Sequence, residues 1–138
     1  NWASEPAEGI QAFCKCKDTR RFLLKALVNA GPPLKEWFQD MDEDFLEQVV
    51  ASGRGWRASG GDEIILQGEQ LGDMAPGLYV LESGELHVFK QRAGESSPGK
   101  LTKKYERRGD TLGELAVLYG APRAATVVAA KDSYLWSI

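Results

Sequence analysis

Apolar residues recur at helical spacing in two stretches near the start of the chain. Between residues 18 and 29, the apolar positions lie on one helix face, and Gly31-Pro32-Pro33 stops the pattern. A second apolar face runs through residues 41–52, where Asp42 is a suitable N-cap. The pattern predicts two helices, separated by a short connector. The apolar residues of that connector are Leu34, Trp37 and Phe38.

After Gly53, glycines separate short apolar runs that are typical of β-strands. Ser83-Gly84 lies between two of these runs and predicts a tight hairpin, whereas the polar residues 91–104 predict a long hairpin loop. The sequence therefore predicts an α+β fold, in which N-terminal helices pack on an antiparallel β-roll, a jelly-roll-like barrel. The predicted strands cover residues 63–66, 78–81, 85–89, 126–130 and 134–138.

One helix-compatible stretch, residues 113–119, interrupts the strand pattern and is closed by Gly120-Ala121-Pro122. The first turn of a helix has free N–H groups, here those of Leu115 and Ala116, and its dipole attracts an anion. Gly113 permits a close approach of the backbone. We therefore predict a short inserted helix that binds a phosphate group.

Arg123 and Glu114 add to this hypothesis because of their positions around the short helix. The guanidinium of Arg123 can donate two parallel hydrogen bonds to phosphate oxygens, and Ala124 and Ala125 leave room for a ligand. The Glu114 carboxylate would repel a phosphate, unless it accepts hydrogen bonds from a sugar hydroxyl. Taken alone, Glu114 is better explained as a favourable carboxylate in the first turn of a helix, and Arg123 as a solvated surface arginine. Their combined spacing favours a nucleotide site.

The same residues closely resemble the phosphate-binding cassette of cyclic-nucleotide-binding domains. The matching segments are Gly113-Glu114-Leu115-Ala116 and residues 119–127, Tyr-Gly-Ala-Pro-Arg-Ala-Ala-Thr-Val. Gln67-Gly68-Glu69 and residues 79–85 are similar to the strand and turn signature of that family. Within the family, the chain is most similar to regulatory subunits of cAMP-dependent protein kinase. The resemblance covers most of residues 62–138.

The resemblance implies a role for several of these residues. Glu114 is expected to bind the ribose 2′-hydroxyl and Arg123 the cyclic phosphate, with backbone amides near Ala116 and Ala124 or Ala125 completing the phosphate site. A threonine commonly follows the arginine in cGMP-selective kinase modules, whereas Ala124 stands there in this chain. We therefore expect cAMP as the ligand, with cGMP as the alternative. The expected ligand-binding residues are Gly113, Glu114, Leu115, Ala116, Pro122, Arg123, Ala124, Ala125 and Thr126.

The domain organisation follows from the same resemblance. We expect an N-terminal extension over residues 1–17 and a cyclic-nucleotide-binding domain over residues 18–138. Within that domain, residues 18–54 form a helical subdomain and residues 55–138 the β-roll. The C-terminal helix that usually caps the base in the family is expected to be absent from this sequence.

The expected function is cAMP-sensing control of a protein kinase, with a kinase catalytic subunit or domain as the protein partner. Two alternatives stay open within this class of fold. One is the cGMP-binding module of a cGMP-dependent kinase, and the other is a structural or docking domain that binds no ligand. A transcription regulator is a third hypothesis, but no helix-turn-helix follows in the sequence.

Composition excludes several other classes of function. A net charge of −3 gives no reason to expect nucleic acid as a partner. Cys14 and Cys16 are poorly spaced for a disulfide and lack the further ligands of a zinc site, and no apolar run suggests a membrane span. We expect a cytoplasmic protein without a cofactor or metal. His87 is interpreted as a strand-face residue, and no nucleophile or acid/base pair indicates an enzyme.

Overall fold

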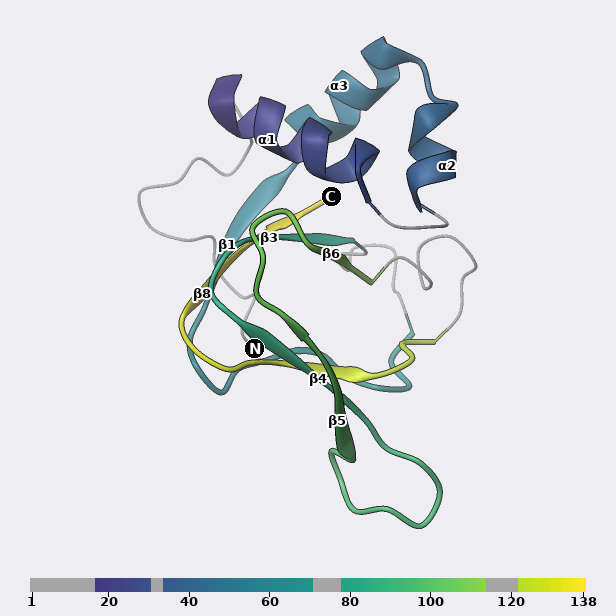
Figure 1. Ribbon diagram of the computed structural model, residues 1–138, viewed down its shortest axis with the longest axis vertical. Coiled ribbons are helices and arrows are strands. Elements are labelled where there is room, and N and C mark those ends of the chain that lie inside the picture. Colours follow the sequence, from purple (N-terminus) through teal and green to yellow (C-terminus); the bar gives the residue numbers. More distant parts are fainter. Residues whose placement is uncertain (1–16, 31–33, 71–77, 114–121) are drawn as a thin grey trace.

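Three helices lie together at one end of a β-roll in the computed structural model, which describes residues 17–30, 34–70, 78–113 and 122–138 (Figure 1). They are α1 (Lys17–Val28), α2 (Leu34–Gln39) and α3 (Glu43–Ala51). The two helices predicted from apolar spacing, α1 and α3, are confirmed with boundaries shifted by one or two residues. No helix in the described ranges is long and apolar enough to cross a membrane.

The ends of the helices show where the sequence interpretation was right and where it was wrong. Asp42 is the N-cap of α3, as predicted, and its side chain accepts a hydrogen bond from the backbone N–H of Asp44 at 3.2 Å. The predicted connector, in contrast, contains the helix α2. Its apolar positions 34, 37 and 38 have the spacing of one helix face, and Phe38 is buried in the core.

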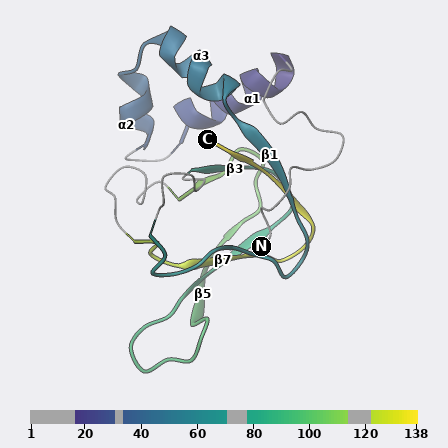
Figure 2. The same ribbon diagram turned by 180° about the vertical axis from the view of Figure 1, so that it is seen from behind.

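The strands form two four-stranded antiparallel sheets, with the orders β1-β8-β3-β6 and β2-β7-β4-β5. The described residues form no closed barrel. Figure 2 shows β1 running on from α3 along the back of the roll. The strands are β1 (Arg54–Ala58), β2 (Glu63–Ile65), β3 (Tyr79–Ser83), β4 (Leu86–Lys90), β5 (Lys100–Tyr105), β6 (Thr111–Leu112), β7 (Thr126–Ala129) and β8 (Ser133–Ser137).

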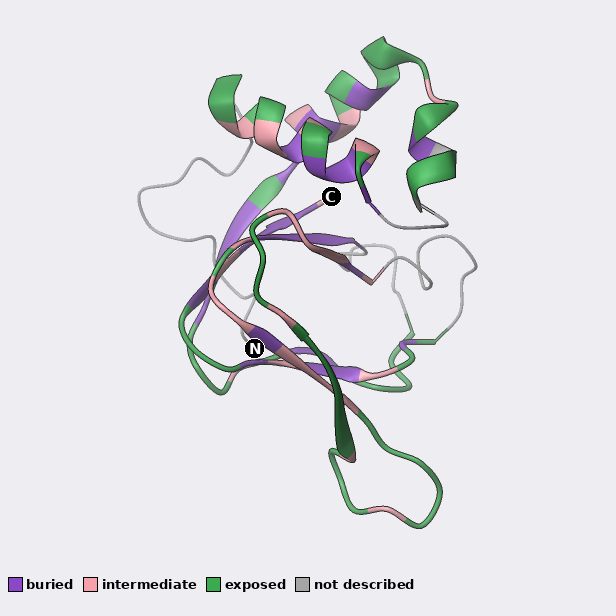
Figure 3. Ribbon diagram, viewed as in Figure 1, coloured by how far each residue is buried: buried purple, intermediate pink, exposed green. Residues whose placement is uncertain are grey.

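The largest error of the sequence interpretation concerns β5, because residues 91–104 were predicted to be a loop. Residues 100–105 instead pair with β4 along its whole length, with His87 opposite Lys104 and Lys90 opposite Lys100. Most side chains of β5 are exposed (Figure 3), and the strand therefore lacks the apolar alternation that would reveal it. Lysines on an edge strand also discourage pairing with another chain.

Two hydrophobic clusters hold the layers together, and β3 contributes to both. Val80 faces the helices and belongs to the cluster of α1 and α3, whereas its neighbours Tyr79 and Leu81 face the interior of the roll. β8 divides its side chains in the same way, with Trp136 toward the helices and Leu135 toward the roll. The alternation of side chains along a strand thus places the sheet of β3 and β8 between the helices and the second sheet.

Candidate functional site

Arg123 lies just before β7 and is a buried charged residue, with 6% of its surface exposed. Its Nη1 donates a hydrogen bond to the carbonyl oxygen of Gly113 at 3.2 Å. Gly113 has a φ of +90°, a backbone conformation that glycine adopts without strain. The structure therefore brings together the two residues that flank the predicted phosphate-binding helix.

The turn after β2 holds the backbone of Arg123 in place. The N–H of Arg123 donates to the carbonyl of Glu69 at 2.9 Å, and the carbonyl of Arg123 accepts from the N–H of Gly68 at 2.8 Å. Thr126 fixes the same turn, because its Oγ1 accepts from the N–H of Gln67 at 3.0 Å. The side chain of Gln67 in turn makes two hydrogen bonds to the backbone of Gln91, at 2.8 and 2.9 Å. The turn after β2 thus fixes the backbone of Arg123 and is itself fixed by Thr126 and Gln91.

Burial lowers the pKa of the Arg123 guanidinium, while its charge interactions with Tyr79 and Glu69 oppose that shift. An arginine nevertheless keeps its charge under all ordinary conditions. Removing such a charge from water is costly, unless anions or hydrogen-bond acceptors surround it. Here the carbonyl of Gly113 accepts a hydrogen bond from the guanidinium, and Glu69 supplies a negative charge that interacts with it.

Four other predicted site residues are neighbours of Arg123 in the sequence: Pro122, Ala124, Ala125 and Thr126. Ala124 is exposed and Ala125 half-buried, so the two positions that follow Arg123 carry small side chains. Pro122 is exposed, whereas Thr126 is buried by its contact with the β2 turn. Glu114, Leu115 and Ala116 lie outside the described residues.

Sequence reasoning missed the residues that support Arg123. Gln67, Gly68 and Glu69 were interpreted as a turn signature, and Tyr79 as part of a strand. The available signal in the sequence was the glycine at position 68, which indicates a turn. In the structure this glycine has a φ of +85°, a conformation that favours glycine. Its contact with Arg123 depends on pairing between distant segments, which a single sequence does not reveal.

We expect Tyr79 to stay protonated well above pH 10. Burial raises the pKa of the Tyr79 hydroxyl to about 12, although Arg123 pulls it back in part. Tyrosines of the unfolded chain ionise near pH 10, so the free energy of unfolding falls between about pH 10 and 12, by up to about 1.4 kcal/mol per pH unit from this residue. Its contribution is fully present below pH 10.

Urea unfolding of the wild type and Tyr79→Phe at several pH values in that range measures this effect. The variant, which lacks the ionisable hydroxyl, should show a flatter dependence on pH than the wild type. Identical slopes would contradict the buried position of the Tyr79 hydroxyl.

His87 lies on the strand β4, as predicted, and its ring also contacts the neighbouring residue Glu85. Its Nε2 lies 2.5 Å from the Oε2 of Glu85, and the hydrogen bond with His87 is the main reason why the pKa of Glu85 is lowered. In the part of the chain that the structure describes, no group of three or more His, Cys, Asp and Glu side chains could hold a metal ion. The pair is thus a local contact on the surface of β4.

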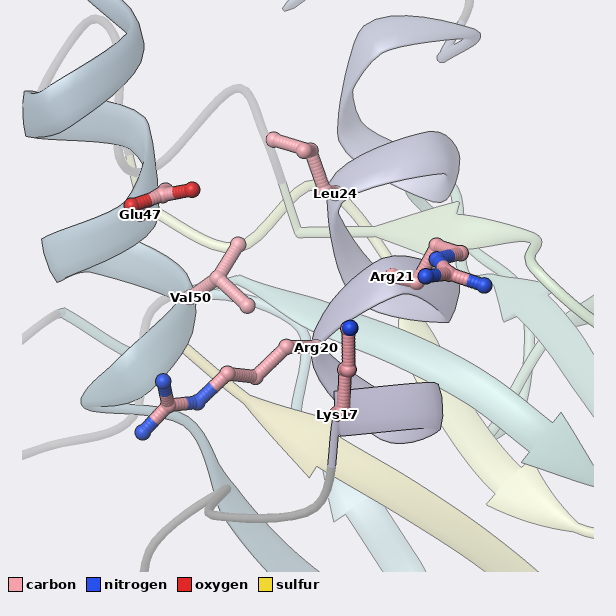
Figure 4. Close-up of a pocket in the computed structure, with 6 residues that line it drawn as sticks. All are labelled: Lys17, Arg20, Arg21, Leu24, Glu47 and Val50. Atoms are coloured by element: carbon pink, nitrogen blue, oxygen red, sulfur yellow. The ribbon is translucent and has the colours of Figure 1, made fainter.

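A separate pocket of about 490 Å³ lies between α1 and α3 (Figure 4). On α1, Arg20 reaches toward α3, while the guanidinium of Arg21 points to the other side of the helix. All lining residues belong to the two helices, so the pocket is distinct from the loop that holds Arg123. They are Lys17, Arg20, Arg21, Leu24, Glu47 and Val50.

Comparisons with known proteins agree with this architecture. The sequence profile of the cyclic nucleotide-binding domain matches residues 57–138. A cAMP-dependent protein kinase regulatory subunit from Blastocladiella emersonii is 40% identical over 101 residues, which are 73% of this chain and 23% of that protein. One from Dictyostelium discoideum is 33% identical over 134 residues, which are 97% of this chain and 37% of that protein.

Among solved structures, the regulatory domain of Toxoplasma gondii PKA, crystallised with cAMP, is similar with a TM-score of 0.72 and 30% identity. The match covers 91% of this chain and 43% of that one. The chain thus spans less than half the length of each of these three relatives. The sequence resemblance is confirmed, and the chain belongs to the cyclic nucleotide-binding domain family.

Proposed function

We propose that the chain binds a cyclic nucleotide beside Arg123, with the guanidinium on the cyclic phosphate. The observation that carries this proposal is the buried position of Arg123, whose Nη1 reaches the carbonyl of Gly113 at 3.2 Å. A guanidinium carries five N–H donors in a planar fork, and this fork matches the paired oxygens of a phosphate. The small side chains of Ala124 and Ala125 allow the ligand to approach.

The remaining roles follow from the family resemblance. Under the proposal, Glu114 accepts hydrogen bonds from the ribose 2′-hydroxyl. Backbone amides near Ala116 and Ala124 or Ala125 complete the phosphate site. The remaining proposed ligand-binding residues are Gly113, Leu115, Pro122 and Thr126.

We further propose that the ligand is cAMP and that its binding regulates a protein kinase. The two curated relatives are cAMP-dependent protein kinase regulatory subunits, and the T. gondii domain was crystallised with cAMP. In this role the chain is a sensor in the cytoplasm rather than an enzyme, and its protein partner is a kinase catalytic subunit or domain. Under the proposal, the helices have two arrangements, and the ligand favours the one to which it binds more tightly. The difference between its two affinities limits how far it can shift the equilibrium between them.

Parallel calorimetric titrations with cAMP and cGMP test the proposal. We expect cAMP to bind at least about tenfold more tightly, a difference of about 1.4 kcal/mol. A tenfold preference for cGMP would overturn the choice of ligand. Binding of neither nucleotide would favour the structural or docking domain instead.

The variant Ala124→Thr should shift the preference toward cGMP. By the family resemblance, a threonine hydroxyl at this position can hydrogen-bond to guanine, and one neutral hydrogen bond contributes about 0.5–1.5 kcal/mol. Ala130→Thr is the matched control, since Ala130 is also exposed but lies in the turn after β7. An equal cGMP affinity of both variants would place Ala124 away from the base.

A further inference from the structure

Arg108, in the turn between β5 and β6, contacts α1 from the side of the β-roll. Its guanidinium carbon lies 4.0 Å from the centre of the Phe22 ring, which is cation–π geometry. Figure 1 shows the loop between β5 and β6 rising to the underside of α1. The turn itself approaches closely, since a Cβ on Gly109 would lie 3.9 Å from both Phe22 and Ala26.

Glu82 on β3 connects Arg108 to the core beneath the helices. Its Oε1 lies 3.7 Å from Nη2 of Arg108, and its Oε2 accepts a hydrogen bond from the indole N–H of Trp136 at 3.2 Å. Trp136 is buried in the same cluster as Leu23 and Leu27 of α1. One carboxylate thus links the turn to a residue that α1 packs against.

The same turn is fastened to the β-roll and leads directly to the nucleotide site. The N–H of Gly109 donates to the carbonyl of Leu81 at 2.7 Å, and the N–H of Leu81 donates to the carbonyl of Asp110 at 2.8 Å. β6 follows at once, and after it Gly113, whose carbonyl accepts from Arg123. Four residues, 109–112, therefore separate Arg108 from the contact between Gly113 and Arg123, and two of them are hydrogen-bonded to Leu81.

We propose that Arg108 is a positioning residue that fastens α1 to the β-roll and couples α1 to the nucleotide site. Its guanidinium packs on the ring of Phe22 in α1 and forms a salt bridge with Glu82 on β3. A shift of Gly113 on nucleotide binding moves the turn and, with it, the Phe22 contact. The coupling half of this proposal rests on the proposed function, whereas the fastening half does not.

Hydrogen exchange of the nucleotide-free chain tests the fastening. In Arg108→Ala, the amides of α1 should exchange about two- to fivefold faster, the range that a cation–π contact at an exposed site supplies. Arg107→Ala is the matched control, because Arg107 is the exposed neighbour of the same charge. Arg108→Lys keeps the charge but loses the planar group over Phe22, and should lie between the wild type and Arg108→Ala. Equal exchange in Arg108→Ala and Arg107→Ala would overturn the fastening.

The same measurement with saturating cAMP tests the coupling. In the wild type and Arg107→Ala, we expect cAMP to change the exchange of α1. In Arg108→Ala, cAMP should still bind, but its effect on the exchange rates of α1 should be at least about twofold smaller. Twofold is about the lower end of what a cation–π contact at an exposed site contributes. An unchanged response in Arg108→Ala would overturn the coupling. If the wild type binds no cyclic nucleotide, the proposed function fails, and the nucleotide-free comparison still supports or overturns the fastening.

Discussion

Arg123→Lys should weaken cAMP binding by about 1.5–3 kcal/mol, or about 10- to 150-fold in affinity. Lysine keeps the positive charge but loses the planar fork that pairs with two phosphate oxygens. It also loses the donor that reaches the carbonyl of Gly113 at 3.2 Å, so this side of the site is less well ordered before the ligand arrives. Calorimetric titration of the wild type and the variant measures the difference.

A matched variant separates this effect from a general change in charge or folding. Arg107→Lys makes the same exchange at an exposed position of the turn before β6 and should keep the affinity of the wild type. Circular dichroism should show folded protein in both variants, since lysine is compatible with the charge of each position. An unchanged affinity of Arg123→Lys would remove Arg123 from the phosphate site.

Gly84→Ala should destabilise the fold by about 2–5 kcal/mol, because two costs combine at this position. Gly84 forms the turn between β3 and β4 with a φ of +105°, a conformation that disfavours alanine. An added Cβ would also lie 2.6 Å from the Cα of Ser133. Ser133 cannot move aside easily, since its hydroxyl accepts from the N–H of Glu85 and donates to the carbonyl of Lys131.

Gly61→Ala is the matched control for this prediction. Gly61 has a φ of +97°, but the space around its added Cβ is open, so only the conformational cost of about 1–2 kcal/mol remains. Urea unfolding followed by tryptophan fluorescence gives both free energies. The close approach of Gly84 to Ser133 would be contradicted if the two variants were equally stable.

The sequence predicted the elements whose apolar spacing is strong, and these elements carry the hydrophobic clusters. α1, α3 and strands such as β3 and β8 bury regular faces, and Asp42 supplies a local cap that the sequence displays. β5 was missed because its side chains are exposed and polar, and only its backbone pairing with β4 makes it a strand. Pairing between distant segments is a tertiary property.

The same difference explains what could be predicted of the site. The sequence identified Arg123 and Gly113 because the two residues flank a short helix-compatible stretch, and the structure joins them by a hydrogen bond. It did not show that Glu69 and Gly68 hold the backbone of Arg123, since they come from a turn more than fifty residues earlier. The contact of Arg108 with Phe22 was missed for the same reason.

Titration of the chain with cAMP and with adenosine tests the phosphate site most directly. The two ligands share the base and the ribose, and only cAMP carries a cyclic phosphate for Arg123. We predict saturable binding of cAMP with an affinity at least about tenfold above that of adenosine, the contribution of about one charge-assisted hydrogen bond. Equal affinities for the two ligands would contradict a phosphate site at Arg123.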